Sequence, residues 1–165
     1  MKSTALVLAA GIALVAAAAC SSVAVRTSPG NVSGEALWNA LQSQKYAQTW
    51  NLWPGKPKLY KGREPHGALL TTYVNGPAYE AILSRQGRMP AGAIVVKENY
   101  KPDRTLAAIT VMWKVPGYNS EAGDWFWAKY APDGTALKQG KVPGCIDCHR
   151  AAADNDYLYT GPLKP

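Results

Sequence analysis

The sequence predicts an α+β fold, built from a mostly antiparallel β-sheet with a few helices. Segments rich in β-branched and aromatic residues follow one another, and short turns join most of them. Short connections favour antiparallel pairing, because a parallel pair needs a long crossover. Two segments with helical spacing of apolar residues precede or interrupt the strands, which predicts helices against one face of the sheet.

The N-terminus has the pattern of an export signal. A short basic start leads into an uncharged run that ends just before Cys20. The run is too short for a membrane span, which needs roughly 20 residues. We therefore predict a signal peptide over residues 1–19 and a flexible tether over residues 20–33.

Cys20 is the expected site of lipidation. It lies in Ala17-Ala18-Ala19-Cys20-Ser21, which resembles a bacterial lipobox. Ordinary cleavage after an A-x-A signal is the alternative. We favour lipidation because an exported chain would otherwise keep an odd cysteine. The expectation is a periplasmic lipoprotein, held at the membrane by its N-terminal lipid.

Residues 34–165 are enough for one domain with a sizeable core. The chain has a formal net charge of +7, but its basic residues are scattered. Only one dense group occurs, interleaved with proline and glycine, and it contains Lys56, Lys58, Lys61 and Arg63. Nucleic-acid binding is not expected, since it would need a longer basic stripe or a known motif. This group is interpreted as a solvated surface, with attraction to anionic lipid or an acidic redox partner as the second interpretation.

The first element of this domain is predicted to be a helix from residue 34 to about Trp50. Its apolar side contains Leu37, Trp38 and Leu41. Residues 51–67 are rich in proline and glycine, which predicts a long loop. A strand is expected over residues 68–74.

A second helix is predicted to have Pro77 in its first turn and to be closed by Gly87. Its buried stripe is expected to contain Tyr79, Ile82 and Leu83. Further strands are predicted between turns that contain proline, aspartate or glycine, over residues 93–100, 106–115, 124–131 and 135–141. A short helical turn is expected over residues 150–153.

The pentapeptide Cys145-Ile146-Asp147-Cys148-His149 has the C-x-x-C-H spacing of c-type haem attachment. Two thiols at this spacing can reach the two vinyl groups on one porphyrin edge, and the histidine can bind the iron as proximal ligand. A thioredoxin-like pair would follow a strand in a βαβ unit, and none precedes this motif. A zinc site would need further ligands, and the only other histidine is His66. We predict covalent haem c on Cys145, Cys148 and His149.

The opposite side of the iron has three candidate residues, which are His66, Met89 and Met112. His66 is a candidate distal base or sixth ligand, although a loop histidine bonded to backbone is the favoured interpretation. The two methionines are interpreted as packing residues. A set of aromatic side chains either lines the haem pocket or fills the core, and it contains Trp113, Trp125, Trp127 and Tyr130.

Several short segments occur in the order found in a known family. They are Tyr73-Val74-Asn75, Val95-Val96-Lys97-Glu98, Gly123-Asp124-Trp125, the haem motif and Asp154-Asn155-Asp156-Tyr157. Through them the chain resembles the cytochrome P-460 family over residues 38–160. The resemblance implies a largely antiparallel β domain that commonly forms a homodimer.

The resemblance also implies a role for Lys97. In the family, a strand lysine at the matching place is joined covalently to the porphyrin, although the related cytochromes c′-beta lack this cross-link. From the residues alone, a lysine in this apolar strand is interpreted as an edge or surface charge. A cross-link would require a neutral amine, so burial beside the haem would have to lower the pKa of Lys97.

The distal side of the haem departs from the family pattern. Cytochromes c′-beta cap the iron with phenylalanines and bind gases such as nitric oxide, but Phe126 is the only phenylalanine of this chain. Members that oxidise hydroxylamine use an arginine where this chain has Leu70, and a carboxylate near the haem. Residues 137–144 contain no Asp or Glu. Both departures weaken the expectation of efficient hydroxylamine oxidation, since proton removal needs a nearby base.

Three functions follow from these observations. The first is a redox enzyme whose five-coordinate haem acts on hydroxylamine or nitric oxide and passes electrons to another cytochrome. The second is a binding protein that holds nitric oxide in the same pocket. The third is an electron carrier, which would need a sixth iron ligand from His66 or a methionine.

Overall fold

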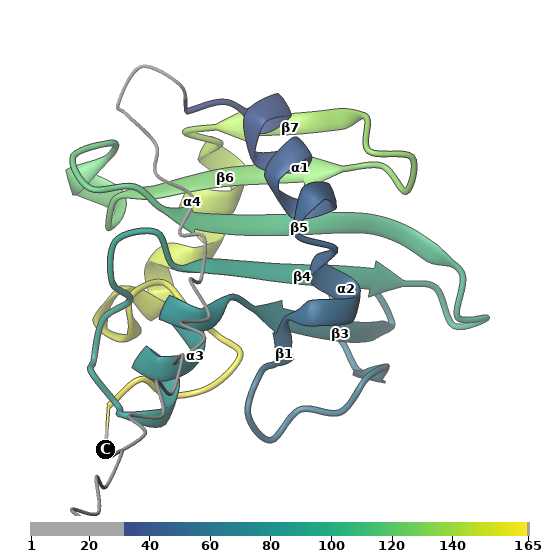
Figure 1. Ribbon diagram of the computed structural model, residues 1–165, viewed down its shortest axis with the longest axis horizontal. Coiled ribbons are helices and arrows are strands. Elements are labelled where there is room, and N and C mark those ends of the chain that lie inside the picture. Colours follow the sequence, from purple (N-terminus) through teal and green to yellow (C-terminus); the bar gives the residue numbers. More distant parts are fainter. Residues whose placement is uncertain (1–31, 165) are drawn as a thin grey trace, which may run out of the picture.

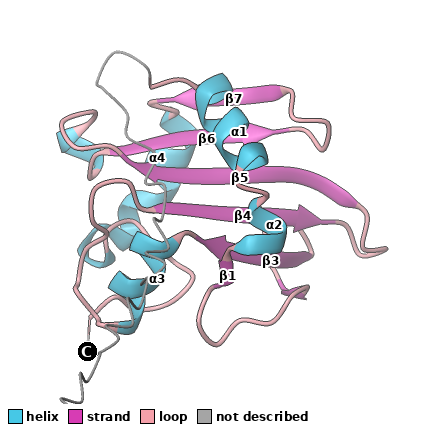
Figure 2. Ribbon diagram, in the orientation of Figure 1, coloured by secondary structure: helices cyan, strands magenta, loops and turns pink. Residues whose placement is uncertain are grey.

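The computed structural model describes residues 32–164, which form one antiparallel sheet with helices on both faces (Figure 1, Figure 2). The expected signal peptide, Cys20 and nearly all of the expected tether lie outside the described residues. Among the described residues, no helix is long and apolar enough to cross a membrane. The α+β class predicted from the sequence is confirmed.

The sheet has seven strands in the described chain, and their order is β1-β3-β4-β5-β6-β7, with β2 also paired to β3. Its long strands are β3 (Leu69–Val74), β4 (Ile94–Tyr100), β5 (Leu106–Lys114) and β6 (Trp125–Tyr130). The edge strand β7 spans Ala136–Gly140. These five strands match the predicted ones in place and order, and every pairing is antiparallel.

The predicted helix from residue 34 to Trp50 is two helices, α1 (Gly34–Ser43) and α2 (Tyr46–Thr49). Lys45 separates them with a φ of 48°, a left-handed conformation that cannot continue a helix. The break turns the chain so that the Tyr46 side chain is buried in the core. The prediction of one continuous helix is therefore wrong.

The predicted loop over residues 51–67 contains two short strands, β1 (Asn51–Leu52) and β2 (Tyr60–Lys61). Both pair with β3, at its two ends. A strand of two residues is too short to show alternation in the sequence. The prolines and glycines of this segment therefore predicted a loop throughout.

Helix α3 (Gly76–Leu83) begins where it was predicted, with the Asn75 side chain accepting a hydrogen bond from the backbone N–H of Ala78. It ends earlier than predicted. Arg85 takes the left-handed conformation that follows the helix, two residues before Gly87. Leu83 is 54% exposed, so its predicted burial is wrong.

Helices cover both faces of the sheet, which corrects the prediction of a single covered face. In Figure 1, α1 and α2 lie in front of the strands and α4 (Pro143–His149) lies behind them. The reason lies in β6, where Trp125, Phe126 and Trp127 are all buried although neighbouring residues point to opposite faces. A strand that is apolar on both sides needs cover on both sides.

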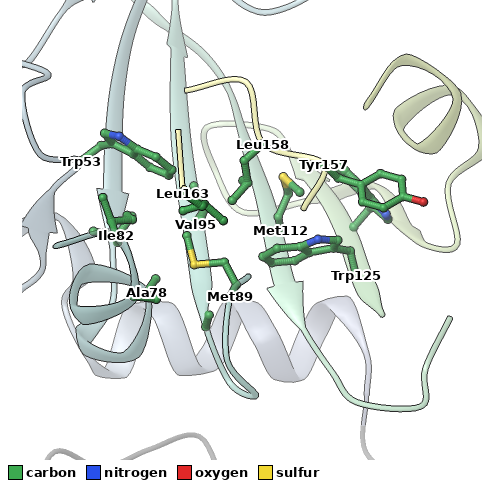
Figure 3. Close-up of a cluster of buried hydrophobic side chains, with 14 of the residues drawn as sticks. Trp53, Ala78, Ile82, Met89, Val95, Met112, Trp125, Tyr157, Leu158 and Leu163 are labelled. Carbon is green, nitrogen blue, oxygen red and sulfur yellow. The ribbon is translucent and has the colours of Figure 1, made fainter. Parts of the chain in front are cut away.

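The face of α1 and α2 holds one core cluster, to which Trp113 and Tyr130 belong. The opposite face holds a second cluster around Met89, Met112 and Trp125 (Figure 3). The chain after α4 continues as the 3-10 helix η3 (Arg150–Asn155) and closes over this second cluster with Leu158 and Leu163. The predicted helical turn at 150–153 lies within η3.

Candidate haem site

A cavity of about 420 Å³ lies between this second face and α4. Strands β4, β5 and β6 form its floor, and the haem motif forms one wall. A second cavity of about 690 Å³ adjoins it, on the side of the loop over residues 61–66. The residues that line both cavities include Pro65, His66, Lys97, Cys148 and His149. The structure therefore brings the predicted cofactor residues, Lys97 and His66 together in one place, with Met112 beside them, whereas Met89 lines neither cavity and packs in the core.

His149 is the last residue of α4, and its ring is 9% exposed. Its Nδ1 atom lies 2.6 Å from the backbone carbonyl oxygen of Tyr157. A carbonyl oxygen only accepts, so Nδ1 carries the proton and Nε2 keeps its lone pair for a metal. Burial lowers the pKa of His149, and the charge of Lys97 acts in the same direction.

The segment after η3, whose Tyr157 carbonyl contacts His149, is fixed by the ion pair between Asp156 and Lys114. Asp156 accepts hydrogen bonds from Lys114 Nζ at 2.6 Å and from the backbone N–H of Met89 at 2.8 Å. The indole N–H of Trp125 donates to the backbone oxygen of Asp156 at 2.9 Å. Asp156 and Tyr157 are both in the left-handed region, at φ values of 53° and 66°. These contacts hold the Tyr157 carbonyl toward the histidine.

Cys148 follows Cys145 by three positions on one helical turn, so both side chains lie on one side of α4 and line the first cavity. Cys145 is half-buried and Cys148 is exposed. Burial raises the pKa of the Cys145 thiol. The spacing brings two thiols and the ligand histidine to one cavity wall.

The residues fit a haem group. The indole N–H of Trp127 is buried against the cavity without a hydrogen-bond partner, and its ring centroid is 4.8 Å from that of His149. Such an orphaned donor indicates space for a further group. Two thiols, an imidazole with a free lone pair and an apolar chamber match covalent haem c. Within residues 32–164, no group of three or more His, Cys, Asp or Glu is placed to hold a metal ion.

Lys97 projects from the middle of the sheet into this cavity. Its strand pairs on both sides, with Thr72 of β3 and Thr110 of β5 as direct neighbours. The sequence-based interpretation as an edge or surface charge is therefore wrong. Lys97 has no acidic partner among the described residues, and burial, with Arg63 and Lys56 adding to it, lowers its pKa to about 8. A fraction of the Lys97 side chains therefore carries a neutral amine near pH 7.

His66 lies in the loop between β2 and β3, and its ring centroid is 6.2 Å from that of His149. Its Nδ1 atom lies 2.9 Å from Oδ1 of Asn99. The favoured interpretation of a histidine bonded to backbone is wrong in this respect, because the ring bonds to a side chain. Burial lowers the pKa of His66 to about 4, and the charge of Lys97 is the second cause.

The aromatic residues separate into two roles. Trp127 lines the cavity, whereas Trp125 packs in the core beside it. Trp113 and Tyr130 belong to the cluster on the opposite face of the sheet. Successive residues of β5 and β6 point to opposite faces of the sheet. Once the face that borders the cavity is known, this alternation tells which aromatic side chains lie on that face.

Sequence reasoning missed three contributors to the site. Asn99 is two residues from Lys97 and so shares its face, and strand alternation could have found it. Arg63 lines the second cavity together with Leu70, the residue at the place of the family's arginine. The hydroxyl of Tyr159 donates to the Cys148 carbonyl oxygen at 2.9 Å, and no sequence signal indicated it.

The charged side chains that line the mostly apolar first cavity are all basic. Lys97, Lys129 and Lys138 line it, and no acidic residue does so in the described chain. Glu98, next to Lys97, points to the opposite face and accepts hydrogen bonds from the hydroxyls of Tyr46 and Tyr100. The acidic residue that lines the second cavity is Glu64, in the loop that also holds His66.

Comparison with known proteins gives an independent assignment. No match was found among curated proteins. The family model described as Cytochrome P460 matches residues 53–160, a range that runs from Trp53 in the core to Thr160 at the cavity. That range contains the haem motif, Lys97, His66 and Asn99. The chain belongs to the cytochrome P460 family.

Proposed function

We propose that this cytochrome carries covalent haem c in the cavity and performs redox chemistry on hydroxylamine or nitric oxide. The observation that carries the proposal is the meeting of Lys97, both motif cysteines and the free Nε2 of His149 in one cavity. Bound haem would supply a redox-active iron to which a small nitrogen oxide can coordinate. His149 would hold the iron, and Cys145 and Cys148 would add their S–H groups across the two vinyl double bonds.

Lys97 is the proposed third attachment point. Its amine would form an N–C bond to the porphyrin in place of one N–H and one C–H bond. That exchange releases two protons and two electrons, which an oxidant of the peroxide class would accept. The lowered pKa of about 8 supports this role, because about a tenth of the amine is neutral at pH 7.

The protein is proposed to act as a periplasmic lipoprotein that exchanges electrons with another cytochrome. The basic residues around the second cavity, Lys56, Lys61 and Arg63, would attract an acidic partner. Loss of palmitate labelling in a Cys20→Ala variant tests the lipid anchor. A homodimer is proposed from the family alone, and sedimentation of the purified protein tests it.

Electron transfer without a substrate is the second candidate. The short separation of the His66 and His149 rings favours it, because two histidines can ligate one haem iron. Binding of nitric oxide in the same pocket is the third candidate. It applies if the haem iron binds this gas but does not convert it.

Two measurements test the leading proposal. Mass spectrometry of haem-bearing peptides should find a peptide with Lys97 joined to the haem peptide, and Lys97→Arg should remove the joined species. Steady-state turnover of hydroxylamine with a cytochrome acceptor should be measurable in the wild-type protein. A free Lys97 peptide together with no turnover would favour the binding or electron-transfer function instead.

A further inference from the structure

The rings of His66 and His149 lie close together, and both residues line both cavities. Their ring centroids are 6.2 Å apart, and their planes are at 89°. Two imidazoles that share one metal ion have similar spacing, since two metal–nitrogen bonds of about 2 Å and the two ring radii together span about 6 Å. The gap between His66 and His149 therefore matches one iron atom.

Asn99 determines which nitrogen of His66 is free. The Asn99 amide N–H groups donate to the carbonyl oxygens of Lys97 at 2.8 Å and Ala108 at 3.1 Å. These two acceptors require the amide nitrogen on that side, so Oδ1 faces His66 and accepts from its Nδ1–H group. The proton is then on Nδ1, and the Nε2 lone pair of His66 is free.

The support behind Asn99 is rigid. The pairing of β4 with β5 shifts register between Asn99 and Tyr100, and the amide group of Asn99 bonds to backbone carbonyls on both strands at this irregularity. Asn99 is 4% exposed. A second shell of this kind fixes the tautomer and orientation of a metal-ligating histidine. His149 has the equivalent support from the Tyr157 carbonyl oxygen.

The cavities are arranged for a group centred between the two rings. Both His66 and His149 line both cavities, so the histidine pair lies where the two chambers meet. Cys145 borders the first chamber alone and Cys148 borders both, whereas Lys56, Lys61 and Arg63 border only the second. A flat group with its vinyl edge at the cysteines would direct its propionates toward these basic residues.

We propose that His66 Nε2 is the sixth ligand of the haem iron in the resting protein, with Asn99 as its positioning residue. The proposal rests on the haem binding in the proposed function, and it adds that a small ligand must displace His66 to reach the iron. His66 is suited to leave, because it lies in a loop between Pro65 and Gly67, outside any helix or strand. The resting state is then six-coordinate, and the reactive state is five-coordinate.

Absorption and electron paramagnetic resonance spectra of the purified holoprotein test the proposal. The ferric wild-type protein should be low-spin with a bis-imidazole signature. His66→Ala should become high-spin, should bind cyanide at least tenfold faster, and should regain the low-spin spectrum when imidazole is added. Asn99→Leu should lower the low-spin fraction, whereas Asn99→Asp, which keeps an oxygen for Nδ1 but loses both amide donors, should lower it less. Ala68→Ser, an exposed change in the same loop that lines neither cavity, is the matched control and should behave as wild type.

A high-spin resting wild-type protein would overturn the proposal. A low-spin His66→Ala protein would overturn it as well, and would assign the sixth position to Met112 or Lys97, which also line the cavity. If His66→Ala does not fold, the wild-type signature still decides between two imidazoles and another ligand pair. A bis-imidazole spectrum without hydroxylamine turnover would reject the proposed redox function alone, and a chain without haem would reject both.

Discussion

The backbone carbonyl of Tyr157 accepts a 2.6 Å hydrogen bond from Nδ1 of His149, and this contact fixes the ring of a histidine that lines the cavity. The contact joins the haem motif to the segment after it, which the buried Lys114–Asp156 pair holds in place. The orientation of the His149 ring therefore depends on an ion pair between β5 and the segment after η3.

Removing Asp156 should destabilise the protein strongly. Asp156→Ala leaves Lys114 nearly buried without its partner, which typically costs about 3–5 kcal/mol in the free energy of unfolding. Chemical denaturation measures the loss. Asp147→Ala is the matched control, because its pair with Arg150 is long at 3.9 Å and exposed, and such pairs contribute about 0–1 kcal/mol. Equal effects of the two changes would contradict the assigned role of Asp156.

The two cysteines should each carry one bond to the haem. Cys145→Ala and Cys148→Ala should each leave a single thioether, and the double variant should leave none unless Lys97 is also joined. Haem staining after denaturing electrophoresis measures attachment, and mass spectrometry counts the bonds. Ser84→Ala, far from the motif in sequence and next to α3, serves as the control. Full staining of a Cys145→Ala, Cys148→Ala, Lys97→Arg triple variant would refute covalent attachment through these residues.

Acid should destabilise the protein through His66. Its pKa is about 4 in the folded protein and about 6.5 in an unfolded chain. Above pH 6.5 the ring is neutral in both states. As the pH falls from 6.5 to 4, the unfolded chain binds a proton that the folded protein excludes, so the free energy of unfolding falls by up to about 3 kcal/mol. Iron ligation by His66 would act in the same direction.

Denaturant midpoints at pH 7 and pH 4.5 measure this dependence. In His66→Gln the difference between the two pH values should be smaller than in the wild-type protein, since this imidazole no longer titrates. An unchanged difference would assign the acid sensitivity to other groups, of which His149 is the nearest.

The exposed charges of the second cavity should control reaction with anions. A Lys61→Glu, Arg63→Glu protein should oxidise more slowly with ferricyanide, by about tenfold at low salt, because a basic rim concentrates anionic reactants. Stopped-flow rates at several ionic strengths measure the effect, which should shrink as salt screens it. Lys101→Glu, Arg104→Glu makes the same change of charge in the exposed turn between β4 and β5. A similar slowing in that control would show that net charge alone is responsible.

Local patterns in the sequence were sufficient for the five longer strands of the sheet and for recognising the C-x-x-C-H spacing. Strands β3 to β7 were predicted because their residues and turns act over short distances, and the spacing of the haem motif is itself local. The break at Lys45 and the strands β1 and β2 were missed, since each depends on contacts with β3 or the core that no window of sequence contains.

The distal side could not be predicted for a related reason. His66 and Asn99 are 33 residues apart in the chain, and their hydrogen bond exists only because β3 and β4 pair beside the loop. The central position of the strand that contains Lys97 could not be predicted either, because the composition of a strand does not tell whether it lies in the middle or at the edge of a sheet. The sequence shows which residue types are present, but it does not show which of them the fold brings into contact.

Strand β4 carries a constraint on how this protein can change over evolutionary time. Lys97 faces the haem cavity, and its neighbour Glu98 faces two tyrosines on the opposite side of the sheet. Losing or gaining a single residue within the strand would exchange the two faces. A carboxylate would then enter the cavity, and an ammonium group would be buried among the tyrosines. Insertions and deletions are therefore tolerable in the turns at either end of β4. Within the strand, deletion of one codon would both reverse the charge at the cavity and damage the core on the opposite face.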